Sequence, residues 1–436
     1  MHRFPNAAKF PERLKAGVNL VGGKLETASD YAYYQTKLVC DIHFTARDRN
    51  RNNRLNALAI PSLHLPGYSW ILRKEMPEIQ LEEVRRFMED CLKAVGAPES
   101  EAQAHADLLM HADTVGHYSH GLNRLEFYIN DIRNGACEPE KKPEVLKDLG
   151  ATAWVDGHNA LGATVGNFCM KLAIQKAKEF GVGWVAAKRC NHFGMAGYWA
   201  LLAEREGLIG MAFTNTSPIM VPTRSTQSAL GTNPIGMAAP AADGDKLVVD
   251  MATTSVAMGK IECQIHKEEP LPPGWALGTD GKPTTDAKDA FKAGKLMPLG
   301  GEEKTSGHKG YALASMVEMF TSGLSGSNMT HNIRGWETDS VQGPPNLGQC
   351  FAAINPDFFA PGFRDRAADC LNTWRNLEPA DPSLPVLAPG DKEHKIGEVT
   401  LGKGTVHYPP KQVEAMDVLA KRIGVKPLRT GLVCKS

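Results

Sequence analysis

The stretch Val182-Gly-Trp-Val-Ala-Ala-Lys-Arg-Cys-Asn-His-Phe-Gly194 decides the fold. Its first six residues form an apolar run that predicts a buried strand. A helical pattern begins at Gly197, so His192 is expected in the loop after the carboxyl end of that strand. In open α/β sheets the ligand crevice lies outside these ends. An imidazole there suits proton transfer near pH 7, although a single loop histidine is more often only solvated.

Two further apolar runs end in segments rich in hydrogen-bonding groups. Leu208–Phe213 leads into Thr214-Asn-Thr-Ser-Pro218, and Leu247–Val249 leads into Asp250-Met-Ala-Thr-Thr-Ser255. Together with the first strand, these runs predict a polar small-molecule site on an apolar scaffold. The alternative is that the strands simply end in polar turns, as most strands do.

The composition argues against several classes of protein. The chain has 436 residues, with 49 Lys+Arg and 49 Asp+Glu, so its formal net charge is zero. It therefore lacks the basic excess of a protein that binds nucleic acid or an anionic membrane, and no apolar run approaches the ~18 to 20 residues of a membrane helix. The nine cysteines are scattered without a C-x-x-C pair, which predicts reduced, mostly buried thiols and a cytoplasmic protein.

Residues 1–77 are predicted to be a poorly ordered extension. The arginine-rich segment from Arg47 to Asn56 has no clear periodicity. Acidic residues are sparse among about the first 25 positions, so a mitochondrial transit segment is the alternative.

The segment 78–150 is predicted to be helical and to lie on the substrate side. Apolar periodicity and stop signals place its helices near 81–95, 99–115 and 122–134. The link before the third helix is bounded by glycines and contains a serine and two histidines. One side of a pocket can therefore be lined by Ser119, His120, Arg124 and Tyr128.

Arg124 and Tyr128 are four residues apart and share a helix face. An arginine in a pocket suits a carboxylate ligand, because its guanidinium fork matches two oxygens. The alternative is an ordinary surface arginine.

From about residue 151 the pattern alternates between strands and helices, which indicates α/β architecture. We predict an α/β cofactor-binding domain at 151–330 and a C-terminal segment at 331–436 that packs back on the helical part. Within the former, Pro270–Gly307 is rich in Pro, Gly, Asp and Lys and predicts a long excursion, followed by a helix from Gly307.

Two common site motifs are missing. The nearest match to the G-x-G-x-x-G dinucleotide fingerprint begins at Gly181, but it follows a helix and leads into a strand. We therefore interpret Gly181 as a helix C-cap. His111, His117 and His120 lie close in sequence, but no Cys or acidic cluster completes a zinc site, so no metal is predicted.

The segments together resemble the type 2 malate/L-lactate dehydrogenase family, which includes sulfolactate and ureidoglycolate dehydrogenases and cyclic imino-acid reductases. The resemblance runs from about residue 78 to 425. It rests on motifs in the family's order: Ser119-His-Gly121 with Arg124, Asn191-His-Phe-Gly194, Gly231-Thr-Asn-Pro-Ile-Gly236, Asp250-Met-Ala-Thr253, Gly307-His-Lys-Gly310 and Ile354-Asn-Pro-Asp-Phe358.

The resemblance implies a family-specific, non-Rossmann NAD(P)-binding fold with an α-helical N-terminal lead-in. It also implies a homodimer with the site near the subunit contact, and His192 as the acid/base. Substrate would be bound by Ser119, His120, Arg124 and Tyr128, with Arg124 on its carboxylate. The cofactor site would be lined by Thr216, Asp250, Met251, Ala252, Lys309, Gly390 and Asp391.

The implied activity is hydride transfer between NAD(P) and C2 of a small L-2-hydroxy acid such as malate, lactate or sulfolactate. The alternatives are reduction of a cyclic imine carboxylate and a non-catalytic cofactor-binding dimer. The choice between NAD and NADP stays open, because a 2′-phosphate needs a basic neighbour that the sequence does not place.

Overall fold

The computed structural model describes residues 77–336 and 343–429. All of them belong to one compact unit. Of the predicted extension 1–77, only Pro77 is among the described residues. The predicted division into segments 78–150, 151–330 and 331–436 stays a prediction.

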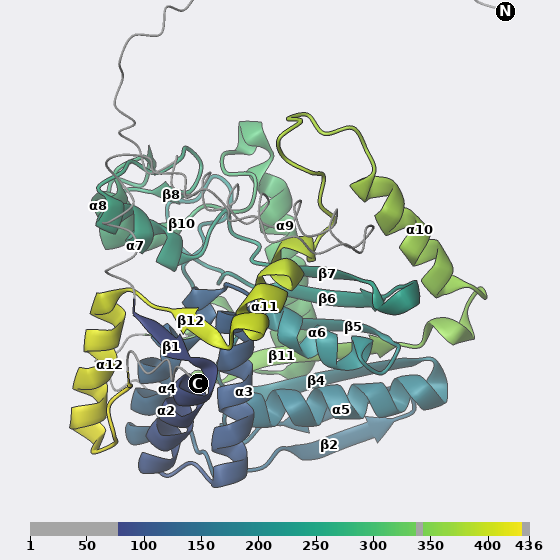
Figure 1. Cartoon of the computed structure of the whole chain (residues 1–436), viewed down its shortest axis with the longest axis horizontal. Helices are drawn as coiled ribbons and strands as arrows, with labels where there is room; N and C mark the ends of the chain where they lie inside the picture. The colour runs from purple at the N-terminus through teal and green to yellow at the C-terminus, as the bar shows by residue number, and fades with distance from the viewer. Residues whose placement is uncertain (1–76, 337–342, 430–436) are drawn as a thin grey trace, which may run out of the picture. The chain divides into compact units, whose positions relative to one another are not determined.

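A mixed seven-stranded sheet is the main element, in the order β2-β3-β4-β11-β5-β6-β7 (Figure 1). Only β3 and β4 pair in parallel, and the other neighbours are antiparallel. The strands are β2 (Glu144–Leu149), β3 (Thr152–Asp156), β4 (Val182–Cys190), β5 (Ile209–Thr214), β6 (Ile235–Pro240), β7 (Lys246–Met251) and β11 (Leu347–Ile354).

Strands β3, β4, β5 and β7 nevertheless run in the same direction. The two strands inserted among them, β11 and β6, run in the opposite direction and are antiparallel to both of their neighbours. Their carboxyl ends, at Asp156, Cys190, Thr214 and Met251, lie at one edge of the sheet. The polar segments that follow these strands therefore lie at the same edge. The rule that ligands bind outside the carboxyl ends of the strands was formulated for mostly parallel sheets, whereas this sheet is mixed.

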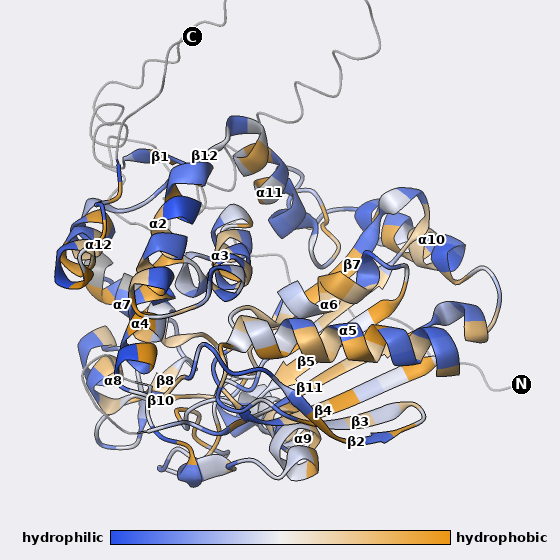
Figure 2. Cartoon of the chain, turned by 90° about the horizontal axis from the view of Figure 1, so that it is seen from below, coloured by the Kyte–Doolittle hydropathy of each residue, from blue (hydrophilic) through white to orange (hydrophobic). Residues whose placement is uncertain are grey.

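Helices cover both faces of the sheet. α5 (Gly162–Phe180) and α6 (Ala196–Glu204) lie on one face, and α9 (Gly307–Glu318) with a π-helical turn at Met319–Gly323 lies on the other (Figure 2). The helix α5 packs closely on β4, because Gly183 has no side chain to strike the backbone of Ala173. Fully buried Trp199 and Phe351 are among the large side chains of this core.

The helical lead-in has a core of its own. β1 (Glu78–Gln80) precedes α2 (Leu81–Ala94), α3 (Glu99–Thr114) and α4 (Leu125–Arg133). The predicted third helix differs in its first turn, Leu122–Arg124, which is a 3-10 turn. The end of the chain packs on these helices: β12 (Thr405–His407) pairs with β1, and α12 (Pro410–Ile423) shares their core.

The predicted excursion at 270–307 is folded. With α7 (Met258–Lys267) it forms a small core around Leu271 and Leu296. Its elements are β8 (Ala276–Leu277), β9 (Pro283–Thr284), α8 (Ala287–Ala293) and β10 (Lys295–Leu296). Among the described residues, the remaining α-helices are α10 (Phe363–Arg375) and α11 (Asp391–Lys403).

Candidate active site

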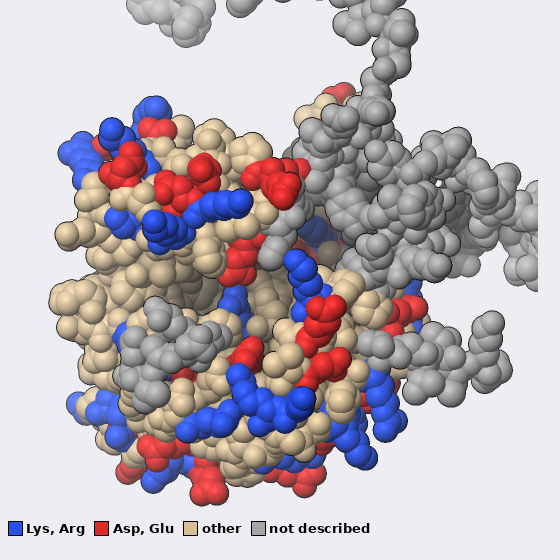
Figure 3. Space-filling model, turned by 90° about the vertical axis from the view of Figure 1, so that its left-hand side faces the viewer, with Lys and Arg blue, Asp and Glu red and all other residues tan. Residues whose placement is uncertain are grey.

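A cavity of about 1110 Å³ opens at the edge where the strands end. In Figure 3 this side of the molecule is hollowed between the part that carries α7 and α8 and the part that carries α12 and α4, with basic and acidic atoms on the walls. One wall comes from Gly116–His120, Arg124 and the loop after β4, and the other comes from segments after β5 and β7 and from the start of α7. The site therefore gathers residues more than 130 positions apart in the sequence.

His192 is held by the backbone of the loop that follows β4. The side chain of Asn191 donates to the carbonyl oxygens of Asn159 (2.7 Å) and Ala160 (3.1 Å), and Gln349 donates to the carbonyl of Asn191 (2.7 Å). Gly162 lies so close to the carbonyl of His192 that a side chain there would overlap it. These contacts fix the backbone around His192 and so the direction in which its side chain points.

His192 Nδ1 faces away from solvent toward Tyr128. The Tyr128 Oη lies 2.7 Å from this atom, and the backbone N–H of Gly194 donates to it at 3.2 Å. The Gly194 contact suits an unprotonated Nδ1, whereas the Tyr128 hydroxyl, which both donates and accepts, can also accept from a protonated Nδ1. With the ring proton on Nδ1 and donated to Tyr128 Oη, Nε2 of the neutral ring is free to accept a proton. Nδ1 is thereby occupied, which leaves Nε2 as the nitrogen for a ligand.

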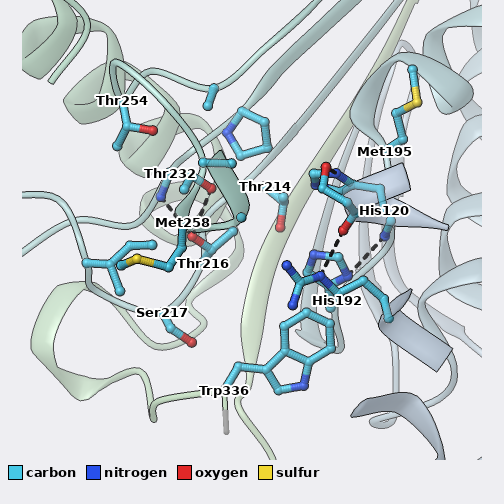
Figure 4. A pocket seen from close by; sticks show the side chains of 18 of the residues that line it. His120, His192, Met195, Thr214, Thr216, Ser217, Thr232, Thr254, Met258 and Trp336 are labelled. Carbon is cyan, nitrogen blue, oxygen red and sulfur yellow. Dashed lines mark hydrogen bonds between the residues drawn. The ribbon is translucent and has the colours of Figure 1, made fainter. Parts of the chain in front are cut away.

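His120 lies beside His192, with ring centroids 6.2 Å apart (Figure 4). The Oγ of Ser119 is 2.9 Å from His120 Nδ1. Burial, together with the nearby Arg124 and His117, lowers the pKa of His120 to about 4. Burial also holds the pKa of His192 well below its usual range, with His120, Arg124 and His105 acting in the same direction. Both rings are therefore neutral at pH 7 and able to accept a proton.

Arg124 supplies a guanidinium to the same wall. Its Nε donates to the carbonyl oxygen of Ser119 (2.8 Å), and its guanidinium lies 5.1 Å from the ring centroid of Phe127. No carboxylate of residues 77–336 or 343–429 forms an ion pair with it within 4.0 Å. Its terminal nitrogens are thus open to an anionic ligand, whose charge would compensate the guanidinium.

Tyr128 lies behind His192 instead of lining the cavity. It is 3 % exposed, and its ring meets that of His105 edge to face, with centroids 4.2 Å apart. The structure thus brings Ser119, His120, Arg124 and His192 together at the cavity and puts Tyr128 in contact with the imidazole.

Four of the predicted cofactor residues line the opposite wall: Thr216, Asp250, Met251 and Ala252. Thr216 Oγ1 accepts from the backbone N–H of Thr232 (2.9 Å), and Asp250 accepts from that of Gly197 (2.8 Å). Burial raises the pKa of Asp250 to about 6, against the effect of this hydrogen bond.

The other three predicted cofactor residues lie outside the cavity lining. Lys309 is exposed in the first turn of α9. Gly390 packs against Val248 of β7, and Asp391 accepts two hydrogen bonds from Arg375. The structure therefore does not bring these residues to the wall that holds Asp250.

The wall fits a nicotinamide dinucleotide. Its lining includes hydroxyl groups from Thr214, Thr216, Thr232 and Thr254 and the apolar side chain of Met258 (Figure 4), as well as Met251. Ribose and phosphate groups need such donors, whereas the rings of the cofactor need apolar surface. The cavity is also larger than the roughly 300–1,000 Å³ of common ligand pockets.

Sequence reasoning missed Trp336, Arg334 and Asp131. The ring of Trp336 stacks on His192, and Asp131 of α4 accepts hydrogen bonds from both Trp336 and Arg334. The helical spacing of Asp131 from Tyr128 was the available signal, since the two residues are three apart in α4. The Trp336 segment has no periodic pattern that would have placed it.

Two absences hold for the described part of the chain. No group of three or more His, Cys, Asp or Glu side chains there could hold a metal ion. None of the described helices is both long and apolar enough to cross a membrane.

Comparisons with known proteins identify the family of the chain. The model of the malate/L-lactate dehydrogenase family matches residues 79–417. Malate dehydrogenase of Pyrococcus abyssi is 36% identical over 353 residues, which cover 80% of this chain and 96% of that protein.

Two solved structures are also similar. Sulfolactate dehydrogenase from Methanocaldococcus jannaschii has 35% identity and a TM-score of 0.73, covering 80% of this chain and 98% of that chain. Delta1-piperideine-2-carboxylate reductase from Pseudomonas syringae has 25% identity and a TM-score of 0.70, covering 78% and 99%. The predicted α/β fold with a helical lead-in is confirmed, and the chain belongs to the malate/L-lactate dehydrogenase family.

Proposed function

We propose that this chain is an NAD(P)-dependent dehydrogenase of a small L-2-hydroxy acid such as malate, lactate or sulfolactate. The observation that carries the proposal is the placement of two neutral imidazoles and one guanidinium on one wall of a cavity. This guanidinium, that of Arg124, has no ion-pair partner within 4.0 Å among the described residues. The cofactor is NAD or NADP, as the family implies.

The first role of the chain is to orient the substrate. Arg124 binds the C1 carboxylate through its terminal nitrogens, and Ser119 and His120 contact the same end of the substrate. Fixing the carboxylate turns C2 toward the wall of Thr216 and Asp250, where the cofactor would lie. When bound there, the nicotinamide would provide the hydride acceptor for oxidation of C2 or the hydride donor for its reduction.

The second role is proton transfer. In the oxidation, His192 Nε2 takes the proton of the C2 hydroxyl. In the reduction, the protonated ring returns a proton to the C2 oxygen. The substrate carboxylate compensates Arg124, which is one of the groups that lower the pKa of His192. Binding of substrate therefore raises the pKa of His192 toward the range that suits this transfer.

Substrate and cofactor are tested together. Oxidation of NADH and of NADPH is followed at the nicotinamide absorbance with oxaloacetate, pyruvate, sulfopyruvate and a cyclic imine carboxylate. Turnover of one 2-oxo acid fixes the reaction and the cofactor. Silence with every compound would contradict the proposal and support a non-catalytic dimer.

A cyclic imine carboxylate is the second candidate substrate, favoured by the similarity to the piperideine-carboxylate reductase. The same Arg124 contact would orient the carboxylate, with an imine nitrogen in place of the C2 oxygen. Turnover of the imine with none of the 2-oxo acids would assign the chain to this reaction.

The assembly and the compartment are also proposals. The family resemblance supports a homodimer, and light scattering after size-exclusion chromatography measures its mass. The scattered cysteines support a cytoplasmic location, with mitochondria as the alternative. Cell fractionation distinguishes the two compartments.

A further inference from the structure

Trp336 covers one face of the His192 ring. The two ring centroids are 4.2 Å apart and the planes are 28° from parallel. Trp336 follows α9 in the chain, whereas His192 follows β4, so this contact joins two distant segments. Figure 4 shows the indole below His192.

The indole is fixed in this position. Its Nε1 donates to Asp131 Oδ2 (2.9 Å), and Asp131 Oδ1 accepts from Arg334 Nη2 (2.7 Å). The side chains of Arg334 and Asp131 are only 9% and 13% exposed. Phe127 and Tyr128 meet the indole at centroid distances of 5.0 and 5.5 Å. Trp336 is therefore held by an ion pair and by aromatic contacts with α4.

The remaining groups around His192 disfavour its protonated form. Arg124 and His120 lie on the cavity wall and His105 lies on α3, and each lowers the pKa of His192. Tyr128 of α4 is a hydrogen-bond partner, and burial raises its pKa, so it is uncharged. An aromatic face attracts a cation, most strongly when the ring is tryptophan.

We infer that Trp336 is a positioning residue that stabilises the protonated state of His192, with Asp131 holding the indole against the imidazole. The inference rests on the proposed function, in which His192 alternates between its neutral and protonated forms. Asp131 also balances the charge of Arg334, so this second guanidinium does not repel the imidazolium.

The kinetic test compares Trp336→Leu, Trp336→Phe and the control Trp374→Leu, which changes a tryptophan that is 38% exposed on α10. The pH dependence of kcat is measured with saturating cofactor and substrate in both directions. Oxidation needs neutral His192 and rises through its pKa, whereas reduction needs the protonated form and falls through it. Loss of the indole lowers this pKa. The breaks in the two pH profiles, which are the pH values at which kcat for oxidation rises and kcat for reduction falls, therefore both move to lower pH.

The expected displacement is roughly 0.5 to 1 pH unit for Trp336→Leu. Trp336→Phe keeps an aromatic face and should show a smaller displacement. Trp374→Leu should show none. A merely structural defect would lower kcat at every pH and leave the breaks in place. If Trp336→Leu does not fold, Trp336→Phe carries the comparison.

A direct titration separates failure of this inference from failure of the proposed function. The His192 Cε1–H signal is followed by NMR against pH in the complex with NADH and the 2-hydroxy acid, and is assigned by its loss in His192→Asn. An unchanged His192 pKa in Trp336→Leu would overturn the role of the indole, whatever the activity. Full turnover of His192→Asn would instead overturn the acid/base assignment, while the titration would still decide the stacking.

Discussion

The two walls of the cavity differ in how their side chains are held. On the wall of His120 and His192, rings and charges support one another through side-chain contacts with α3, α4 and the Trp336 segment. On the wall of Thr216 and Asp250, the polar side chains are held mainly by backbone N–H groups. The first arrangement suits proton transfer, which depends on charge, and the second suits a ligand held by shape. Substitutions on the two walls should therefore affect different kinetic constants.

The largest effect is expected on the first wall. His192→Ala should lower kcat roughly 10²- to 10⁴-fold, the usual value of general acid–base catalysis, with little change in cofactor affinity. The measurement is steady-state turnover together with cofactor titration by fluorescence. His394→Ala, which alters a side chain that is 65% exposed, is the control. A larger loss in His120→Ala than in His192→Ala would exchange the roles of the two rings.

Arg124→Lys should raise the KM for the acid substrate roughly 10- to 100-fold, because a bidentate charged contact of about 1.5–3 kcal/mol is lost. The KM for cofactor should stay within about twofold. Initial rates over a grid of both concentrations give the two constants. Arg133→Lys, at the exposed last residue of α4, is the control. An unchanged substrate KM would show that another group binds the carboxylate.

Gly231→Ala tests the second wall. A Cβ at this position would overlap Thr216 Oγ1 and approach its carbonyl oxygen. We expect roughly a tenfold rise in the KM for cofactor, the order of an overpacking cost, and a steady KM for the acid. Gly402→Ala is the control, since a Cβ there meets nothing within 4 Å. A selective rise in the KM for the acid would assign this wall to the substrate.

The smallest effect concerns stability beside the first wall. Burial raises the pKa of Asp113 to about 7, although Tyr408 and the backbone of Leu122 donate hydrogen bonds to it. Between the unfolded pKa near 3.8 and about 7, the folded protein binds more protons, so raising the pH lowers its stability. The fall in Tm between pH 4.5 and pH 8 should be smaller in Asp113→Asn than in the unsubstituted protein by roughly 2–4 °C. Parallel Tm curves for the two proteins would refute the prediction.

The sequence allowed the strands and helices with strong patterns to be predicted. The runs that became β4, β5 and β7 were found because they are apolar and lead into polar segments. β2 was missed because all six of its residues are exposed at the edge of the sheet, so no alternation marks it. β6 was missed because its segment contains glycine, alanine and proline instead of β-branched residues.

For the site, the sequence predicted the residues that motifs mark but not the contacts between distant segments. Ser119, His120, Arg124 and His192 lie at the cavity, as expected. Tyr128 was expected to bind substrate but contacts the imidazole, because the angle between α4 and the loop after β4 is set by tertiary packing. Trp336 could not be predicted, since its contact depends on how the chain returns after α9.

The position of β11 has a consequence for how the chain folds during synthesis. This strand lies between β4 and β5, although about 130 residues or more separate it from either in the sequence. A nascent chain that has emerged only to β7 contains β2–β3–β4 and β5–β6–β7 as two separate pieces, with unpaired edges where β11 belongs. In the helical lead-in, β1 pairs with β12, which begins near residue 405. Most of the chain must therefore leave the ribosome before the core of the sheet or the core of the lead-in can be completed. Pairings over such long sequence distances fold slowly and leave strand edges open to aggregation until the late strands are available.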